Sequence, residues 1–501
     1  MSSPSAQPNR KQVSPKKNNR QRANWQKNKN TSPLPQAPPL LRASGLKPAR
    51  LLRAFGQLFV HAQIHTWLSP RPRGFYQRAF TPLVVLWYLV YQRLSPKHTL
   101  SQVVTDARDG GADRLSPRGR PLSQALKSEA TTSYSDARQL LPLNTLTQAL
   151  RHLAQQATAS LLLPHWLGLR VGLLDGSTFR LRPFGDIPKE FPPHRTGTAR
   201  ANPYWCVARM VGLFCQASGL LMDSAVGSLK TSEQTLSWLL LQQDWAGWVI
   251  VGDRNFGVYS MVRAMVAAHA QAVVRLTEVR AKRLAKAMGH KLVAGLDLRL
   301  SWSPSPYDQI PAESQGLPVH GRLVVVRMAR SGFRPMNFYL FTTLTDASVY
   351  TTEALAELYG RRWQVEMCFR YVKAEMDLGQ LDCKSADMAR KEWLAGLMAY
   401  NLVRWALGLA AAQAKVPVGS LSFSRARELI WHWLERCGKR YASPTAWARL
   451  LDRIGRCRQS KRRKLRPAQP RAVRPRRRDY ADLKGSRAEA CKKLAIANAK
   501  S

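Results

Sequence analysis

Acidic residues are scarce in this chain of 501 residues, and none occurs in its first 105 positions. There are 31 Asp and Glu against 78 Lys and Arg, which gives a formal net charge of +47 at pH 7. An excess of this size opposes compaction through self-repulsion unless a polyanion lies nearby. The composition therefore favours a nucleic-acid binder, a nucleic-acid enzyme or a protein with polybasic tails at a membrane surface.

Paired cysteines and long apolar runs are also lacking. The seven Cys include no C-x-x-C pair, so neither a disulfide framework nor a zinc knuckle is indicated. The longest apolar run, residues 82–91, is too short to span a bilayer and predicts a buried helix. Because the N-terminus also lacks the apolar core of an export signal, we expect a reduced, cytoplasmic protein with no membrane partner.

Basic residues gather at both ends of the chain. Residues 1–45 are rich in Pro, Ser, Asn, Gln, Lys and Arg, a composition that predicts a disordered arm. Residues 453–478 carry 13 Lys and Arg and no acid, and prolines interrupt them, so we predict a basic tail over 456–501. Such segments bind phosphates in a salt-sensitive way without reading sequence, although they can also serve only as solvated tails.

The residues between these ends predict an α/β protein with helical flanks. Apolar residues recur at helical spacing over 46–165. A series of strands and helices then follows, with a helix expected from Thr231 or Ser232 to about residue 243. Three strands, a helix and a fourth strand beside the first make up the layout of an RNase H-like mixed sheet. The predicted strands are 171–179, 205–214, 220–226, 248–252 and 272–276; a β-rich insertion is expected over 279–335, and helices over 352–377 and 386–412.

Two aspartates are placed where chemistry is expected. Asp175 lies inside the apolar run of the first strand, and Asp253 directly follows the fourth. A charged, unpaired acid at a buried strand costs several kcal/mol, which argues for a cation or a base beside it. Taken singly, each could be a turn former or a hydrogen-bonded buried acid. In an RNase H-like sheet the two positions lie side by side.

A third acid lies on a predicted helix with three other functional residues. At about 100° per residue, Tyr359, Arg362, Glu366 and Lys373 fall within about a 60° arc. One helix face would then present a phenol, a guanidinium, a carboxylate and an ammonium. Surface ion pairs alone would explain such a face on an ordinary helix.

These residues resemble the signature Y-x2-R-x3-E-x6-K of the IS4 family of DDE insertion-sequence transposases, the group that includes the Tn5 transposase. Tyr359, Arg362, Glu366 and Lys373 meet it in full, and four fixed residues at fixed spacing are a specific signal. The blocks 174–179 and 252–257 also resemble the surroundings of the first and second acids of the family. The resemblance covers about residues 100–415.

The resemblance implies a site and a reaction. Asp175, Asp253 and Glu366 would be the catalytic acids and would hold two Mg²⁺ ions, for which Mn²⁺ is expected to substitute. Tyr359, Arg362 and Lys373 would bind DNA phosphates beside the cut. The reaction would be cut-and-paste transposition through a DNA hairpin, acting on terminal inverted repeats and target DNA in a bacterial, nucleoid-associated setting.

The resemblance also implies a separate role for each part of the chain. Residues 46–165 would bind the element's ends, and residues 166–415 would form the RNase H-like catalytic domain with its β-rich insertion. A helical segment over 416–455 would support a homodimer assembled on DNA. Two other interpretations stay open: a non-catalytic basic protein that coats DNA or RNA on a retained RNase H-like scaffold, and a nuclease or resolvase without strand transfer.

Overall fold

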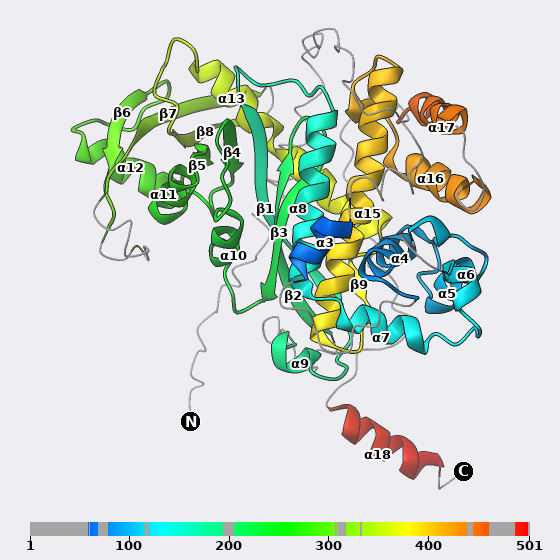
Figure 1. The fold of residues 1–501 in the computed structure, drawn as a ribbon. Coiled ribbons are helices and arrows are strands. Elements are labelled where there is room, and N and C mark those ends of the chain that lie inside the picture. Colours follow the sequence, from blue (N-terminus) through cyan, green and yellow to red (C-terminus); the bar gives the residue numbers. More distant parts are fainter. Residues whose placement is uncertain are drawn as a thin grey trace, which may run out of the picture.

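The structure is a computed structural model, in which helices and strands form where the local sequence favours them. It describes residues 59, 61–68, 79–115, 120–193, 205–305, 308, 317–330, 333–437, 444–459 and 486–498. The predicted basic arm 1–45 and the larger part of the predicted tail 456–501 lie outside these residues. A mixed sheet forms one side of the molecule, and helices from both ends of the chain form the other (Figure 1).

The central sheet has the predicted RNase H-like order. Its path is β3-β2-β1-β4-β5-β8-β7-β6, and β9, Gln380–Leu381, also pairs with β1. The strands β1, β2 and β3 are antiparallel neighbours, whereas β4 and β5 run parallel to β1. The fourth strand therefore lies beside the first, as predicted. Their bounds are β1 Arg170–Leu181, β2 Cys206–Cys215, β3 Leu221–Ser228, β4 Trp248–Gly252 and β5 Gln271–Arg275.

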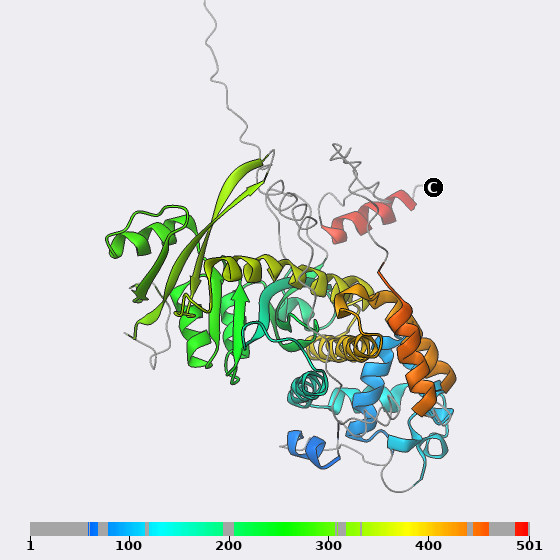
Figure 2. The same cartoon turned by 90° about the horizontal axis from the view of Figure 1, so that it is seen from above.

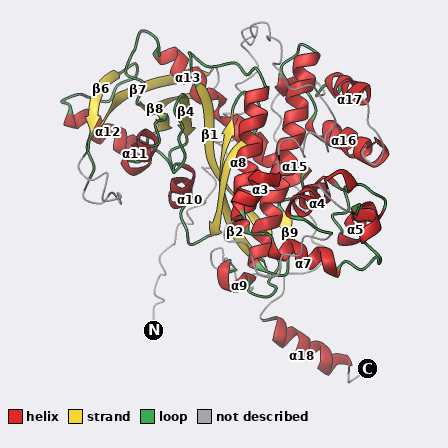
Figure 3. Cartoon of the chain, in the orientation of Figure 1, coloured by secondary structure: helices red, strands yellow, loops and turns green. Residues whose placement is uncertain are grey.

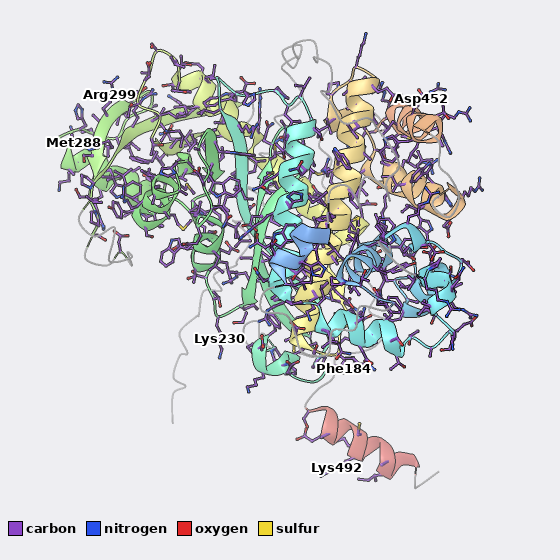
Figure 4. All side chains as sticks on the ribbon, in the orientation of Figure 1. Phe184, Lys230, Met288, Arg299, Asp452 and Lys492 are labelled. Carbon is purple, nitrogen blue, oxygen red and sulfur yellow. The ribbon has the colours of Figure 1, made fainter. Side chains whose placement is uncertain are left out.

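The predicted β-rich insertion extends this same sheet instead of forming a separate one. After helix α12, Glu278–Ala287, come β6 Asp297–Trp302, β7 Val319–Arg330 and β8 Phe333–Thr342. Strand β8 pairs antiparallel with β5, so the edge that β5 would otherwise expose is covered. Seen from above, these strands project away from the helical part of the molecule (Figure 2). Figure 4 labels Met288 and Arg299 at this outer end.

Helices cover both faces of the sheet (Figure 3). Helix α10, Glu233–Leu240, packs on β2 and β3, and α11, Tyr259–Ala267, packs on β5. Ser232 caps α10 by accepting a hydrogen bond from the Thr235 backbone N–H at 3.0 Å, as the sequence predicted. Side chains alternate between the faces of a strand. Asp175 and Phe179 of β1 therefore point to one face, and Gly176 lies on the other.

Helix α15, Ala386–Gln413, links the sheet to the helical flanks. Its Trp393 stacks on Phe179 of β1 with ring centroids 4.2 Å apart. Its Asn401 amide makes two 2.8 Å hydrogen bonds with the backbone of Leu221, at the start of β3. The helix is long and apolar enough to cross a membrane, but 94% of the relevant window is buried inside the protein. It is a core helix.

The flanking helices pack around α15. Among them, α4, which contains the apolar run predicted to be a buried helix, is buried along its whole length. The later helices α16 and α17 also pack on α15 and on each other, and Trp431 of α16 packs against Tyr91 of α4 with ring centroids 5.2 Å apart. The bounds are α3 His61–Trp67, α4 Pro82–Leu94, α5 Leu100–Arg108, α6 Leu122–Ala125, α7 Thr132–Leu140, α8 Leu143–Ser160, α9 Ile187–Glu190, α16 Phe423–Cys437, α17 Pro444–Arg456 and α18 Arg487–Asn498.

Candidate active site

Two of the predicted acids meet at the end of β4. In the parallel ladder Leu174 is level with Gly252, so Asp175 and Asp253 are the next pair beyond it. Asp175 Oδ1 accepts a 2.8 Å hydrogen bond from the Gly176 backbone N–H, and Asp253 Oδ1 accepts one of the same length from the Asn255 N–H. The predicted placement of both aspartates is confirmed.

The signature residues lie on one continuous helical segment that packs against β1. It begins with α13, Thr352–Gly360, passes through a 3-10 turn at Arg361–Trp363 and α14, Gln364–Arg370, and ends in a π-helix at Tyr371–Glu375. Thr351 caps its start by accepting from the Ala354 N–H at 3.2 Å. Because the helix type changes along the segment, the rotation per residue is not a constant 100° over its full length.

Arg362 is the centre of the site. Its Nη1 lies 3.2 Å from Asp175 Oδ2, and its Nη2 lies 3.8 Å from Glu366 Oε1. The side chain of Arg362 is 15% exposed and that of Glu366 is 50% exposed. The guanidinium of Arg362 therefore bridges Asp175 on the sheet and Glu366 on the helix. At the other end of the segment, Lys373 Nζ lies 3.4 Å from the Ser177 hydroxyl, two residues beyond Asp175 on the same face of β1.

The electrostatics show that the acids share one environment. Burial raises the pKa of Asp175 to about 6; the nearby charge of Asp253 adds to this effect, and the guanidinium of Arg362 opposes it. Burial lowers the pKa of Arg362, but Tyr359, Asp175, Asp253 and Glu366 together hold that pKa above its ordinary value. Asp175 and Glu366 thus lie beside the same guanidinium, and Asp253 is near enough to affect its pKa.

Tyr359 differs from the prediction in its exposure. Its side chain is buried, and burial raises the pKa of its phenol. The centroid of its ring lies 6.2 Å from that of Phe338. The Arg275 guanidinium carbon lies over the Phe338 ring, 4.5 Å from its centroid. The phenol lies near Arg362 and Asp253, since both affect its pKa. The helix face is therefore not uniformly presented to solvent: it is buried at Tyr359 and opens toward Glu366.

The donors fit a divalent cation chemically. Asp175, Asp253 and Glu366 offer only carboxylate oxygens, the ligands that Mg²⁺ and Mn²⁺ prefer. In the part of the chain that the structure describes, no three His, Cys, Asp or Glu side chains converge closely enough to form a metal site as they stand. The acids are instead gathered around Arg362, so a positive charge already occupies the position between two of them.

Sequence reasoning missed two residues beside these acids. Glu233, the first residue of α10, lies next to Gly176, and Asn255 donates a 2.7 Å hydrogen bond from Nδ2 to Glu233 Oε2. At the sequence level Glu233 is only an acid that follows a helix cap, which is a common arrangement. Its nearness to Asp175 depends on how α10 packs on the sheet.

Comparison with known proteins gives consistent matches. The family model described as a transposase DDE domain matches residues 166–402. The transposase InsG for insertion sequence element IS4 of Escherichia coli (strain K12) is 26% identical over 70% of this chain and 75% of its own length. A probable transposase for insertion sequence element IS5377 of Geobacillus stearothermophilus is 29% identical over 19% of this chain and 25% of its own length.

One solved structure also matches, though weakly. It is the cryo-EM structure of the piggyBac transposase synaptic complex with hairpin DNA, with a TM-score of 0.39, 12% identity, and coverage of 81% of this chain and 85% of that one. A score of this size does not establish a shared fold. Together with the signature on the helix that carries Glu366, the sequence matches lead to one conclusion: residues 166–402 form a transposase DDE domain, and the chain is similar to an IS4 transposase over 70% of its length.

Proposed function

We propose that this chain catalyses cut-and-paste transposition of an insertion sequence, by hydrolysis and transesterification of DNA phosphodiesters at the element's ends, through a DNA hairpin. The observation that carries the proposal is the grouping of Asp175, Asp253 and Glu366 around Arg362. Three acids from two strands and a helix meet in the domain that matches the transposase family.

The acids are proposed to hold two Mg²⁺ ions, for which Mn²⁺ can substitute. Such ions activate an attacking oxygen and stabilise a leaving oxygen in phosphodiester chemistry. The residues themselves have defined tasks. Asp175 must be ionised to act as a ligand, and its pKa of about 6 leaves it ionised at neutral pH. Arg362 holds Asp175 and Glu366 near each other despite their mutual repulsion.

The basic residues of the signature are proposed to bind DNA phosphates beside the cut. Arg362 offers a guanidinium suited to bidentate phosphate contacts, and Lys373 offers a point charge at the other end of the segment. Tyr359 is assigned to the same phosphate-binding group; its buried ring also fixes the position of Arg362. Binding of the inverted repeats by residues 46–165, a homodimer assembled on DNA, and a bacterial cytoplasmic location are parts of the same proposal.

A cleavage assay tests the proposal. DNA carrying the inverted repeats that flank the gene is incubated with Mg²⁺ and wild-type protein, Asp175→Ala or Asp244→Ala, and is analysed on a denaturing gel. We expect flush double-strand ends and a hairpin band from wild type, none from Asp175→Ala, and normal products from Asp244→Ala. Asp244 is the matched control because it is exposed and precedes β4, whereas the site lies beyond that strand's other end.

Two results would contradict the proposal. A shift of every DNA tested, with no cutting by any variant, would favour the non-catalytic coating protein. Nicking without a hairpin or strand joining would favour a nuclease that lacks strand transfer.

A further inference from the structure

The sheet has an opening beside the two aspartates. Strand β4 ends at Gly252, level with Leu174 of β1. Within the described residues, β1 has no further neighbour on that side until β9, which pairs with Arg180 and Leu181. Between Leu174 and Arg180, no described strand pairs with β1 on this side, so the sheet does not separate its two faces there. A side chain from the helices on the far face can therefore approach the acids that Arg362 holds on the near face.

The side chain of Glu233 lies at this opening. A Cβ added to Gly176 would lie 2.5 Å from the Glu233 Cδ and 2.6 Å from its Oε1, far inside contact distance. The carboxylate of Glu233 therefore lies against the backbone directly after Asp175. Gly176 leaves room for it, and any larger residue would displace it.

Asn255 fixes the carboxylate from the other side. Its Nδ2 donates to Glu233 Oε2 at 2.7 Å, and its backbone N–H donates to Asp253 Oδ1 at 2.8 Å. A single residue thus ties Glu233 to Asp253. The Oε1 atom of Glu233 has no hydrogen-bond partner among the described residues, and no Lys, Arg or His in that part of the chain forms an ion pair with this carboxylate.

A simpler role for Glu233 would be to complement the dipole at the start of α10. Glu278 shows what that role looks like elsewhere in the same chain. It too is the first residue of a helix behind a Thr or Ser cap, but it is 56% exposed and pairs with Lys282 at 2.7 Å. Glu233 instead lies against Gly176 and accepts a hydrogen bond from Asn255, and its charge is one of those that raise the pKa of Asp175.

We propose that Glu233 is a fourth carboxylate of the catalytic centre, which helps Asp175 and Asp253 to hold the divalent cation. This inference rests on the proposed function of that site. A carboxylate placed among others without a basic partner is unfavourable unless a cation joins them. The arrangement of Gly176, Glu233 and Asn255 holds it there.

Binding of Mn²⁺ to the full chain without DNA, followed by electron paramagnetic resonance, tests the inference. Glu233→Gln keeps the shape of the side chain and its acceptor for Asn255, and should weaken Mn²⁺ binding about tenfold. Glu278→Gln removes the same charge from an equivalent helix position and should leave binding unchanged. Asp175→Asn should weaken binding at least as much as Glu233→Gln.

Gly176→Ala provides a second variant that keeps every acid. Its new methyl group should push the Glu233 carboxylate away and weaken Mn²⁺ binding, which decides the question if Glu233→Gln does not fold. Wild-type affinity in Glu233→Gln beside weak binding in Asp175→Asn would overturn the inference and leave the proposed function standing. Equal effects of Glu233→Gln and Glu278→Gln would also overturn it. Failure of wild type to bind Mn²⁺ would overturn both.

Discussion

Two clusters in the described part of the chain combine arginine and carboxylate in opposite proportions. In the acid cluster, Asp175 and Glu366 lie beside the guanidinium of Arg362, and Asp253 is near enough to affect the pKa of that guanidinium. In the Glu392 cluster, one carboxylate on α15 pairs with both Arg93 of α4 and Arg138 of α7. The side chains of the Glu392 cluster are at most 12% exposed, whereas Glu366 is half exposed.

The difference distinguishes a structural cluster from the proposed functional one. The Glu392 cluster joins the helical flank to the core, and its acid serves two buried cations. In the acid cluster, Asp175 and Glu366 lie beside one guanidinium, and the cluster opens to solvent on the side of Glu366. Carboxylates that are held close together and left accessible to solvent are suited to binding positive charge.

The largest effect on stability is expected at Glu392. Glu392→Gln leaves two buried guanidiniums without a counter-charge and should lower the free energy of unfolding by about 3 kcal/mol, measured by urea denaturation. Glu428→Gln breaks only an exposed ion pair with Arg425 and should change stability by less than about 0.5 kcal/mol. Equal stability of the two variants would show that the Glu392 cluster is not structural.

A smaller effect of opposite sign is expected at Asp175. Its pKa is raised from 3.8 to about 6 in the folded chain, so the folded state binds more protons than the unfolded state between these values, and stability falls as pH rises through them. Above pH 6 the cost of the charge is fully present. Without metal, Asp175→Asn should therefore stabilise the protein by about 2 kcal/mol at pH 8 and by nearly nothing at pH 4.

Asp452→Asn is the control for this measurement. Asp452 is exposed on α17, where Figure 4 labels it at the opposite end of the molecule from β6. Its replacement should change stability by less than about 0.5 kcal/mol at either pH. A destabilised Asp175→Asn at pH 8 would mean that the ion pair with Arg362 outweighs the repulsion among the acids, and the comparison of the two clusters would fail.

The sequence allowed the prediction of features that depend on local pattern. Strand periodicity placed Asp175 inside β1 and Asp253 directly after β4, and the fixed spacing placed Glu366 on the helix beside them. Ser232 as the cap of α10 was equally readable, because capping depends on adjacent residues.

Features that depend on distant pairing could not be predicted in the same way. The antiparallel pairing of β8 with β5 joins segments separated by the whole insertion, and nothing in either strand specifies its partner. The burial of Tyr359 arises from its contact with Phe338 of β8, and the position of Glu233 arises from the packing of α10 against the sheet. Each needed the three-dimensional arrangement.

The acids around Arg362 are proposed to perform chemistry on bound DNA. Glu366→Gln tests this claim most directly, with binding to the element's ends measured by gel shift and strand cleavage measured in the same Mg²⁺-containing reaction. We predict nearly unchanged end binding with no cleavage, because the change removes a proposed metal ligand and no phosphate contact. Undiminished cleavage, or loss of binding and cleavage together, would contradict the claim.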